Sequence, residues 1–265
     1  MMMNEPRFAR LQQSLQQGFT LEPKAIFKEG WARINGAKMP LILAALGVAG
    51  FWLVLSQVTT RLVANPEEAS WQLSLLGLLV SMGLAPMTAA LDMMGIARSV
   101  DKPIRPNQIF NYFGSLVPLA AASLLMGILS AALMAVIQML GLPAVLTMLP
   151  MLLLSVALMF TFPLILEKGF TPLQAIMTSL KLFSRQWLQL LAIQVFFILL
   201  FIVAILSLGI ALIWVAPLFM VVKGIIYREV CGVEGETDHK DAGPNSDVHA
   251  AQPPSLNSSK DKFEA

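Results

Sequence analysis

The chain has 265 residues, of which 57% are hydrophobic and 13% are charged, whereas a soluble globular protein has about 45–50% apolar and about 25% charged residues. Its mean hydropathy of +0.72 leaves too little polar surface for a water-soluble protein of this size. These values exclude a soluble enzyme, a nucleic-acid-binding protein and a secreted disulfide-stabilised protein. The formal net charge is only +2, so the charge balance indicates no polyanionic partner.

The N-terminal segment is polar, and we expect it to be retained. The first apolar run starts near Met39, behind 38 residues that include six Lys or Arg. A cleavable signal peptide would place its apolar region within about the first 15–30 residues, so we interpret this run as a membrane span. The single cysteine, Cys231, excludes an intramolecular disulfide and a cysteine-based metal cluster.

Six apolar segments are long enough to cross a membrane as helices, which takes about 20 mostly apolar residues. The last apolar block, 187–227, is too long for one span, and we expect it to turn at 207–209 and form two. The sequence therefore predicts an all-α polytopic membrane bundle of six transmembrane helices. The first four spans are expected at about 39–60, 71–96, 115–140 and 143–166, the last with Pro150 and Pro163 inside or at its edges.

The distribution of basic residues predicts the orientation of the spans. The N-terminal segment, the second and fourth connections and the residue after the sixth span together contain thirteen Lys or Arg, whereas the remaining connections contain only Arg61. Such an excess of basic residues is typical of the cytoplasmic side. We therefore expect both termini to lie in the cytoplasm.

The chain divides into three parts by composition. We expect a cytoplasmic N-terminal segment with an interfacial helix at 1–38, a six-span domain at 39–231 and a cytoplasmic tail at 232–265. The tail has seven acidic and three basic residues and no apolar periodicity, which is typical of disorder. His239 and His249, the two histidines of the chain, lie there. We interpret them as part of a solvated tail, with metal binding as the alternative.

Three segments on the expected cytoplasmic side resemble one another. They begin at Pro23, Pro106 and Pro172, and each continues with apolar residues at helical spacing. Proline suits the first turn of a helix, and the pattern is typical of short helices in the membrane interface. With the prolines of the returning spans, these segments predict three pseudo-repeats, and chance similarity among leucine-rich segments is the alternative. The limits of the expected repeats are 22–98, 102–169 and 170–231.

Two charged residues lie inside the expected spans at matching positions. Asp92 follows Pro86 by six residues, and Lys223 follows Pro217 by six. Charges within a span are costly and mark functional candidates. We predict an ion pair between the second and sixth spans. The alternatives are a local pair of Asp92 with Arg98 while Lys223 extends to the lipid headgroups, and a proton or cation transport site at Asp92.

Further candidates lie at the expected interface and in the first span. Trp31, Arg105 and Lys168 lie in or beside the expected interfacial helices, where such side chains contact lipid headgroups. Gly47 and Gly50 give the first span a face of small residues, which favours close packing of helices. We expect lipid contact from the first set and helix contact from the second.

The part of the chain expected to fold lacks the residues of common catalytic motifs. It has no histidine to act as a general base, and the sequence contains no GxSxG, HExxH or GxxxxGK[ST] motif. A membrane-embedded hydrolase that relies on a single aspartate would have only Asp92 within a span. We therefore expect no enzymatic activity, no catalytic or metal-binding residue and no cofactor.

Two stretches resemble a broad group of uncharacterised bacterial inner-membrane proteins. The first is Leu164–Gly169 with Ala175–Trp187, and the second is Trp214–Pro217 with Ile226–Glu229. That group also resembles the membrane region attached to some glycerophosphodiester phosphodiesterases. The similarity covers about residues 22–231 and lacks their catalytic domain. It therefore implies a six-span protein of the bacterial inner membrane, concerned with the envelope or its lipids, without their activity.

These observations favour an integral inner-membrane protein with a structural, lipid-linked or accessory role in the envelope. Its expected partners are the lipid bilayer and a specific lipid or membrane protein, and not a nucleic acid. The alternative is a small transporter or channel subunit that uses Asp92. Transporters often contain internal repeats and broken helices at the midplane, whereas the two charged residues here lie near the cytoplasmic end of their spans.

Overall fold

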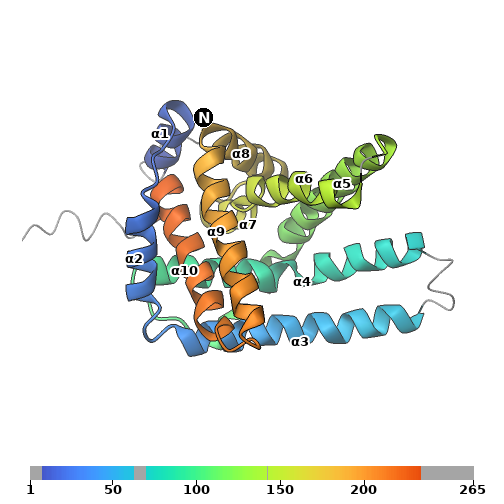
Figure 1. Cartoon of the computed structure of the whole chain (residues 1–265), viewed down its shortest axis with the longest axis horizontal. Coiled ribbons are helices and arrows are strands. Elements are labelled where there is room, and N and C mark those ends of the chain that lie inside the picture. The colour runs from blue at the N-terminus through green and yellow to red at the C-terminus, as the bar shows by residue number, and fades with distance from the viewer. Residues whose placement is uncertain (1–7, 63–69, 142, 234–265) are drawn as a thin grey trace, which may run out of the picture. The chain divides into compact units, whose positions relative to one another are not determined.

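The structure, a computed structural model, describes residues 8–62, 70–141 and 143–233, and all regular elements in these ranges are helical. Figure 1 shows how they are arranged. In chain order they are α1 (Ala9–Gln17), α2 (Pro23–Arg33), α3 (Lys38–Leu62), α4 (Ser70–Ser99), the 3₁₀-helices η3 (Pro106–Phe110) and η4 (Phe113–Ser115), α5 (Leu116–Met139), α6 (Ala144–Ala157), α7 (Thr161–Lys168), α8 (Pro172–Arg185), α9 (Trp187–Leu206) and α10 (Leu212–Cys231).

Five helical segments of the described chain are long and apolar enough to cross a membrane. They are Lys38–Arg61, Gln72–Ser99, Pro106–Met139, Leu146–Lys168 and Trp187–Leu206. This confirms the expectation of a helical membrane protein. The predicted sixth span corresponds to α10, which is not among these five and contains three charged residues, Lys223, Arg228 and Glu229.

The long apolar block turns where the sequence predicts. α9 ends at Leu206, and α10 begins at Leu212. Between them Leu208 and Gly209 have φ angles of 56° and 82°, in the left-handed region that a helix cannot continue through. The Gly209 N–H then donates to the carbonyl oxygen of Ala204 at 3.0 Å, which satisfies one of the free carbonyls at the end of α9.

The predicted fourth span is not one continuous helix. It consists of α6 and α7, which are separated at residues 158–160. Pro163 causes the break, because its ring has no N–H and would clash with the carbonyl of Met159 in a continuous α-helix. Pro150, in contrast, lies inside α6 without ending it.

The second half of α10 forms the centre of the core. Its side chains from Pro217 onward are largely buried, and Val221, Ile225 and Val230 are fully so. This helix contacts α1, α2, α3, α4 and α9. A helix that is apolar around most of its circumference is expected to be surrounded by other helices, and α10 fits this rule. Its three charged residues are tolerated in an apolar protein because each of them is paired.

α3 and α9 are also apolar on all sides, but large parts of them are uncovered. Phe51, Trp52 and Leu53 on α3 and Leu199 and Leu206 on α9 are each about half exposed or more. Contiguous apolar surface of this extent is unfavourable in water. It is the surface that lipid chains would cover in a membrane.

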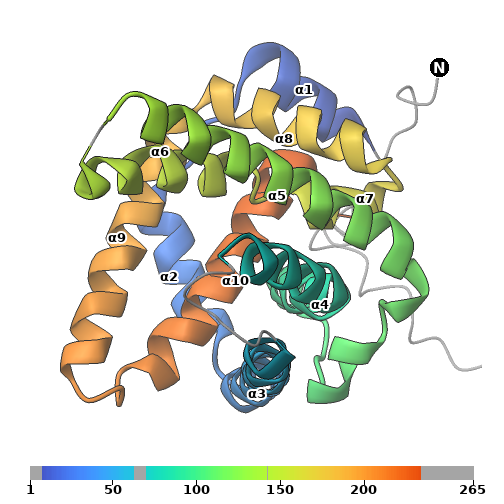
Figure 2. The same cartoon turned by 90° about the vertical axis from the view of Figure 1, so that its right-hand side faces the viewer.

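The long helices form three hairpins, α3 with α4, α5 with α6, and α9 with α10. Figures 1 and 2 show that the three hairpins extend in different directions, with α4 and α10 crossing where they converge. The short elements α2, η3 and α8 each precede one hairpin. We call the ends of the hairpins that adjoin these short elements the basic side, because the loops there contain most of the Lys and Arg residues.

The N-terminal segment, expected at 1–38, packs against the helices that follow it. α1 and α2 both contact α10, and the described helices belong to a compact unit that ends at Val233. On α2, Phe27 lies 4.6 Å and 5.3 Å from Phe196 and Phe197 between ring centroids. The expected tail, apart from Gly232 and Val233, lies outside the described residues, and so do His239 and His249.

Candidate functional site

The two charged residues predicted inside the spans contact each other across two helices. Lys223 of α10 donates a hydrogen bond from Nζ to Oδ1 of Asp92 on α4 at 2.7 Å. The two side chains are 21% and 16% exposed. The predicted interhelical pair is therefore present. Arg98 instead donates from Nε to the carbonyl oxygen of Arg33 at 2.8 Å and from Nη2 to that of Asn35 at 3.2 Å.

The pair lies beside a crossing at which the backbones of α4 and α10 approach each other closely. A Cβ added to Gly95 of α4 would lie 2.2 Å from the carbonyl oxygen of Met220, and one added to Gly224 would lie 2.3 Å from the carbonyl carbon of Gly95. Such separations are possible only for glycine, so these two residues allow the backbones of α4 and α10 to touch. The crossing fixes the depth at which Asp92 and Lys223 meet.

The glycines predicted to make a close helix contact are not at this crossing. A Cβ on Gly50 would meet nothing within 4 Å, and one on Gly47 would meet only the end of the Ile109 side chain, at 3.2 Å. The packing role expected for Gly50 is therefore wrong. Small residues favour close packing, but only the partner helix decides which of them is used, and α3 presents this face outward.

Two small hollows flank the ion pair. One is lined by Asp92, Phe160, Pro163 and Tyr227 among others, and the other by residues that include Lys223 and Gln194. Neither has room for more than about one water molecule. In this state of the protein, no path for a larger solute reaches Asp92 through these hollows.

The break between α6 and α7 forms one wall of the first hollow and is held by Ser179 of α8. The Ser179 hydroxyl donates to the carbonyl oxygen of Ala157 at 2.5 Å and accepts from the N–H of Phe160 at 3.3 Å. Both backbone groups belong to the interrupted turn, and Ser179 is fully buried. A single side chain thus replaces part of the hydrogen bonding that the missing turn would have provided.

A network of ion pairs joins the helix ends on the basic side. Arg228 donates from Nη1 and Nη2 to the two carboxylate oxygens of Glu29 at 2.7 Å and 3.0 Å, and from Nη2 to Glu229 at 2.9 Å. Glu29 also accepts from Nε of Arg33 at 2.7 Å, and Glu229 accepts from Nη2 of Arg10 at 2.6 Å. These five residues, here called the basic-side network, connect α1, α2 and α10.

The electrostatics of Glu29 follow from this geometry. Partial burial opposes ionisation of the Glu29 carboxyl, but the hydrogen bonds and positive charges of Arg228 and Arg33 outweigh it and lower its pKa below the usual 4.5. The same arginines extend the network to α4 and the loop after it, because Arg228 also donates to the carbonyl oxygen of Ser99 and Arg33 pairs with Asp101 at 2.5 Å.

The three residues predicted to contact headgroups differ in position. Trp31 is 56% exposed, and Arg105 is exposed in the segment before η3. Lys168, in contrast, is only 3% exposed and pairs with Glu167 at 3.4 Å. The burial of Lys168 therefore opposes the headgroup contact expected of it, because α8 folds back onto α7 and covers this end of the helix.

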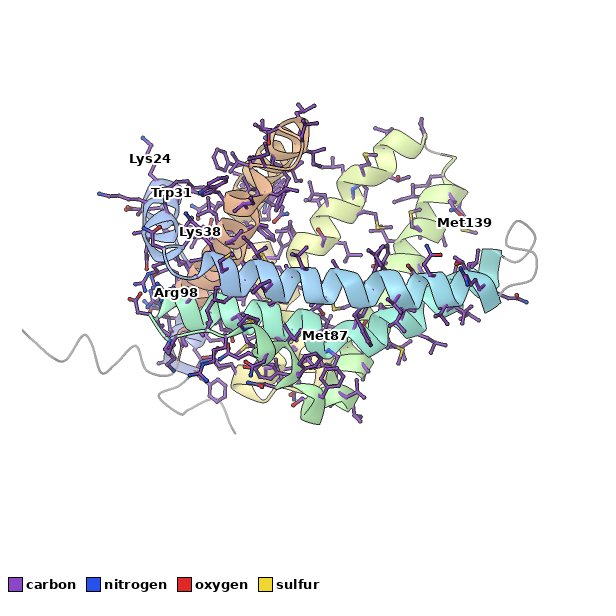
Figure 3. The ribbon with its side chains drawn as sticks, turned by 90° about the horizontal axis from the view of Figure 1, so that it is seen from below. Lys24, Trp31, Lys38, Met87, Arg98 and Met139 are labelled. Atoms are coloured by element: carbon purple, nitrogen blue, oxygen red, sulfur yellow. The ribbon has the colours of Figure 1, made fainter. Side chains whose placement is uncertain are left out.

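Figure 3 shows Lys24, Trp31, Lys38 and Arg98 together near one end of α3 and α4, and Met139 toward the opposite end of these two helices. Among the described residues no group of three or more His, Cys, Asp or Glu residues is placed to hold a metal ion.

Comparison with known protein families, curated proteins and solved structures finds no match for this chain. The resemblance to bacterial six-span proteins and to the membrane region of glycerophosphodiester phosphodiesterases remains a hypothesis, supported by the stretches named above.

Proposed function

We propose that the chain is a six-span integral membrane protein of the bacterial inner membrane with a structural, lipid-linked or accessory role and no catalytic activity. Five candidate spans support this, and α10 is the proposed sixth. α10 has the length of a span, with 20 residues. Its charges do not argue against insertion, because Lys223 and Arg228 are paired and Glu229 accepts from two arginines.

The proposed orientation places the basic side in the cytoplasm. It rests on the thirteen basic residues of that side against the single Arg61 of the other. An even number of spans then places both termini in the cytoplasm.

We also propose that the domain consists of three pseudo-repeats. Their support is that α2, η3 and α8 each have proline as their first residue and each precede one helical hairpin. The match is incomplete, because the second element is a 3₁₀-helix and the other two are α-helices. This difference places the strongest support on the first and third repeats, whose returning helices contain Asp92 and Lys223.

The observation that carries the proposed role is the Asp92–Lys223 ion pair. Asp92 of α4 and Lys223 of α10 interact with each other through a 2.7 Å hydrogen bond, and the hollows beside them are small. A residue that binds a transported ion needs contact with a water-filled path. The pair instead holds α4 against α10, which suits a protein whose outer surface contacts lipid or another membrane protein.

The alternative is a small transporter or channel subunit that uses Asp92. One observation favours this alternative: the ion pair lies beside an interrupted helix, at the break between α6 and α7. Broken helices next to intramembrane charges are a feature of transporters.

Native mass spectrometry of the gently extracted protein, together with flux measurements in proteoliposomes, separates the two proposals. The accessory or lipid-linked role predicts stoichiometric bound lipid or a partner subunit, and no ion or solute flux. The transporter predicts flux that Asp92→Asn abolishes. A double variant, Asp92→Leu with Lys223→Met, removes both charges without leaving either unpaired. If flux is present and this variant lacks it while keeping the wild-type melting temperature, the accessory role is wrong.

A further inference from the structure

The basic residues described on the basic side fall into two classes. Residues of the first class have partners: ion pairs or hydrogen bonds, as in the basic-side network, or, for Lys38, the ring of Trp214, whose centroid lies 5.7 Å from Nζ. Those of the second class have no carboxylate partner within the described part of the chain. The six residues of this second class, here called the surface cations, are Lys24, Lys28, Lys102, Arg105, Lys181 and Arg185, and all are exposed.

The surface cations occur as three pairs, one at each short element that precedes a hairpin. Lys24 and Lys28 lie on α2, and Lys181 and Arg185 lie on α8. Within each of these two pairs the residues are four apart, so they share one face of the helix with about 5–6 Å between their Cβ atoms. The third pair, Lys102 and Arg105, lies in the loop that leads into η3.

Each pair has an exposed aromatic side chain nearby in the sequence. Trp31 of α2 is 56% exposed, Phe110 of η3 is 60% exposed, and Trp187, which follows α8, is 45% exposed. Aromatic side chains, and Trp above all, are enriched at the depth of lipid headgroups, next to Lys and Arg. Exposed apolar side chains adjoin the α8 pair in the sequence, Met177 four residues before Lys181 and Leu188 three residues after Arg185, so the surface changes there from cationic to apolar within a few residues.

We propose that the three pairs of surface cations are binding sites for the headgroups of anionic phospholipids. This proposal deepens the lipid-linked role and rests on the chain being a membrane protein. Two adjacent cations can both donate hydrogen bonds to the oxygens of one negatively charged phosphodiester, and the neighbouring aromatic ring lies against the glycerol and the first carbons of the acyl chains. An acidic soluble protein would match the charge but not the exposed apolar side chains at the same place.

The test measures binding of phosphatidylglycerol and phosphatidylcholine to the delipidated full-length protein in neutral detergent, by native mass spectrometry. The wild type is expected to bind phosphatidylglycerol more tightly. Each cation at an anionic surface contributes about fivefold to affinity, so Lys181→Gln with Arg185→Gln is expected to weaken one site about 30-fold. Replacing all six surface cations with Gln is expected to weaken all sites. The differences should shrink as salt is raised.

Arg61→Gln is the matched control. Arg61 is exposed and basic, but it lies at the opposite end of α3 from the basic side. This variant is expected to bind phosphatidylglycerol as the wild type does. Melting temperatures verify that every variant is folded, which is expected because all substituted side chains are exposed.

Several outcomes would overturn the proposal. One is equal binding of both lipids by the wild type, and another is unchanged binding of phosphatidylglycerol by the six-residue variant. A third is that soluble glycerol phosphate displaces phosphatidylglycerol as effectively as the lipid itself does, which would indicate a site for free phosphate. A preference for phosphatidylglycerol that arises only when residues 234–265 are deleted would show that the acidic tail occupies the cations instead. Flux that depends on Asp92 would contradict the accessory role and leave the headgroup sites intact, so the two proposals fail separately.

Discussion

The most consequential residues are Asp92 and Lys223, because each would be a buried unpaired charge without the other. Their side chains are 16% and 21% exposed, and Oδ1 of Asp92 lies 2.7 Å from Nζ of Lys223. Bringing two charges out of water is costly, and their attraction offsets this cost only while both are present. The pair therefore contributes less to net stability than to specificity: it favours one register of α4 against α10 over all others.

This reasoning predicts the result of a double-mutant cycle. Asp92→Leu or Lys223→Met alone is expected to lower the free energy of unfolding by about 3–5 kcal/mol, whereas the two substitutions together are expected to cost little or to stabilise. Thermal unfolding in detergent, followed by tryptophan fluorescence, measures the difference. The charge-swapped Asp92→Lys with Lys223→Asp should express better than either of its single variants. If it does not, the two residues do not function as a pair.

Glu29 predicts a pH dependence at the basic side. Because Arg228 and Arg33 lower its pKa below 4.5 despite partial burial, Glu29 contributes stability that is fully present above pH 4.5 and is lost as the pH falls through its lowered pKa. Glu29→Gln is expected to cost about 1.5–3 kcal/mol at pH 7, the range of hydrogen bonds to charged groups. The melting temperatures of wild type and variant should converge as the pH is lowered toward 3. A difference that does not change with pH would contradict this explanation.

At the scale of elements, the crossing of α4 and α10 depends on two glycines. Gly224→Ala would place a methyl group 2.3 Å from the backbone of Gly95, which forces the helices apart. We expect a loss of at least about 1–3 kcal/mol, the usual cost of overpacking, and loss of the ion pair beside it. Gly50→Ala and Gly83→Ala are matched controls, because nothing lies within 4 Å of either added Cβ. They should be neutral or stabilise by up to about 1 kcal/mol, as measured by thermal unfolding.

Ser179 is the second element-scale contact, since it joins α8 to the break between α6 and α7. Ser179→Ala would leave the carbonyl of Ala157 and the N–H of Phe160 without this partner, at a cost of about 1–3 kcal/mol. Ser184→Ala is the matched control, because this exposed hydroxyl bonds only to the carbonyl of Lys181 in its own helix. Equal melting temperatures of the two variants would show that Ser179 does not hold the break.

These elements also show what sequence patterns predict and what they do not. The turn at 207–209 was predictable because the apolar block at 187–227 is too long for one span. The Asp92–Lys223 pair was predictable because equal offsets from Pro86 and Pro217 suggest that the two residues lie at one depth. The burial of Lys168 was not predicted because hydropathy does not reveal that α8 folds back over α7. The Gly95–Gly224 crossing was missed because close packing is a property of two helices. Its available signal was a glycine within three residues of each charge, Gly95 after Asp92 and Gly224 after Lys223.

At the scale of the whole molecule, the number of spans decides on which side of the membrane each loop lies. If α10 crosses the membrane, the turn at Leu208 and the surface cations lie on opposite sides. If α10 does not cross, the turn at Leu208 and the chain after Cys231 lie on the same side. Cys231 is fully buried, so single cysteines can be introduced at surface positions over a low labelling background, with Cys231→Ser as the control.

A membrane-impermeant thiol reagent applied to intact bacterial cells distinguishes these arrangements. Cysteines at Arg61, Leu140 and Leu208 are expected to react in intact cells, whereas those at Lys28, Lys102 and Lys181 should react only after the membrane is permeabilised. The reason is that the proposed six-span topology assigns the three turns and the surface cations to opposite sides of the bilayer. Labelling at Leu208 and at a C-terminal cysteine from the same side would contradict the sixth span. It would also move α10, with Lys223 and the basic-side network, out of the transmembrane part of the protein.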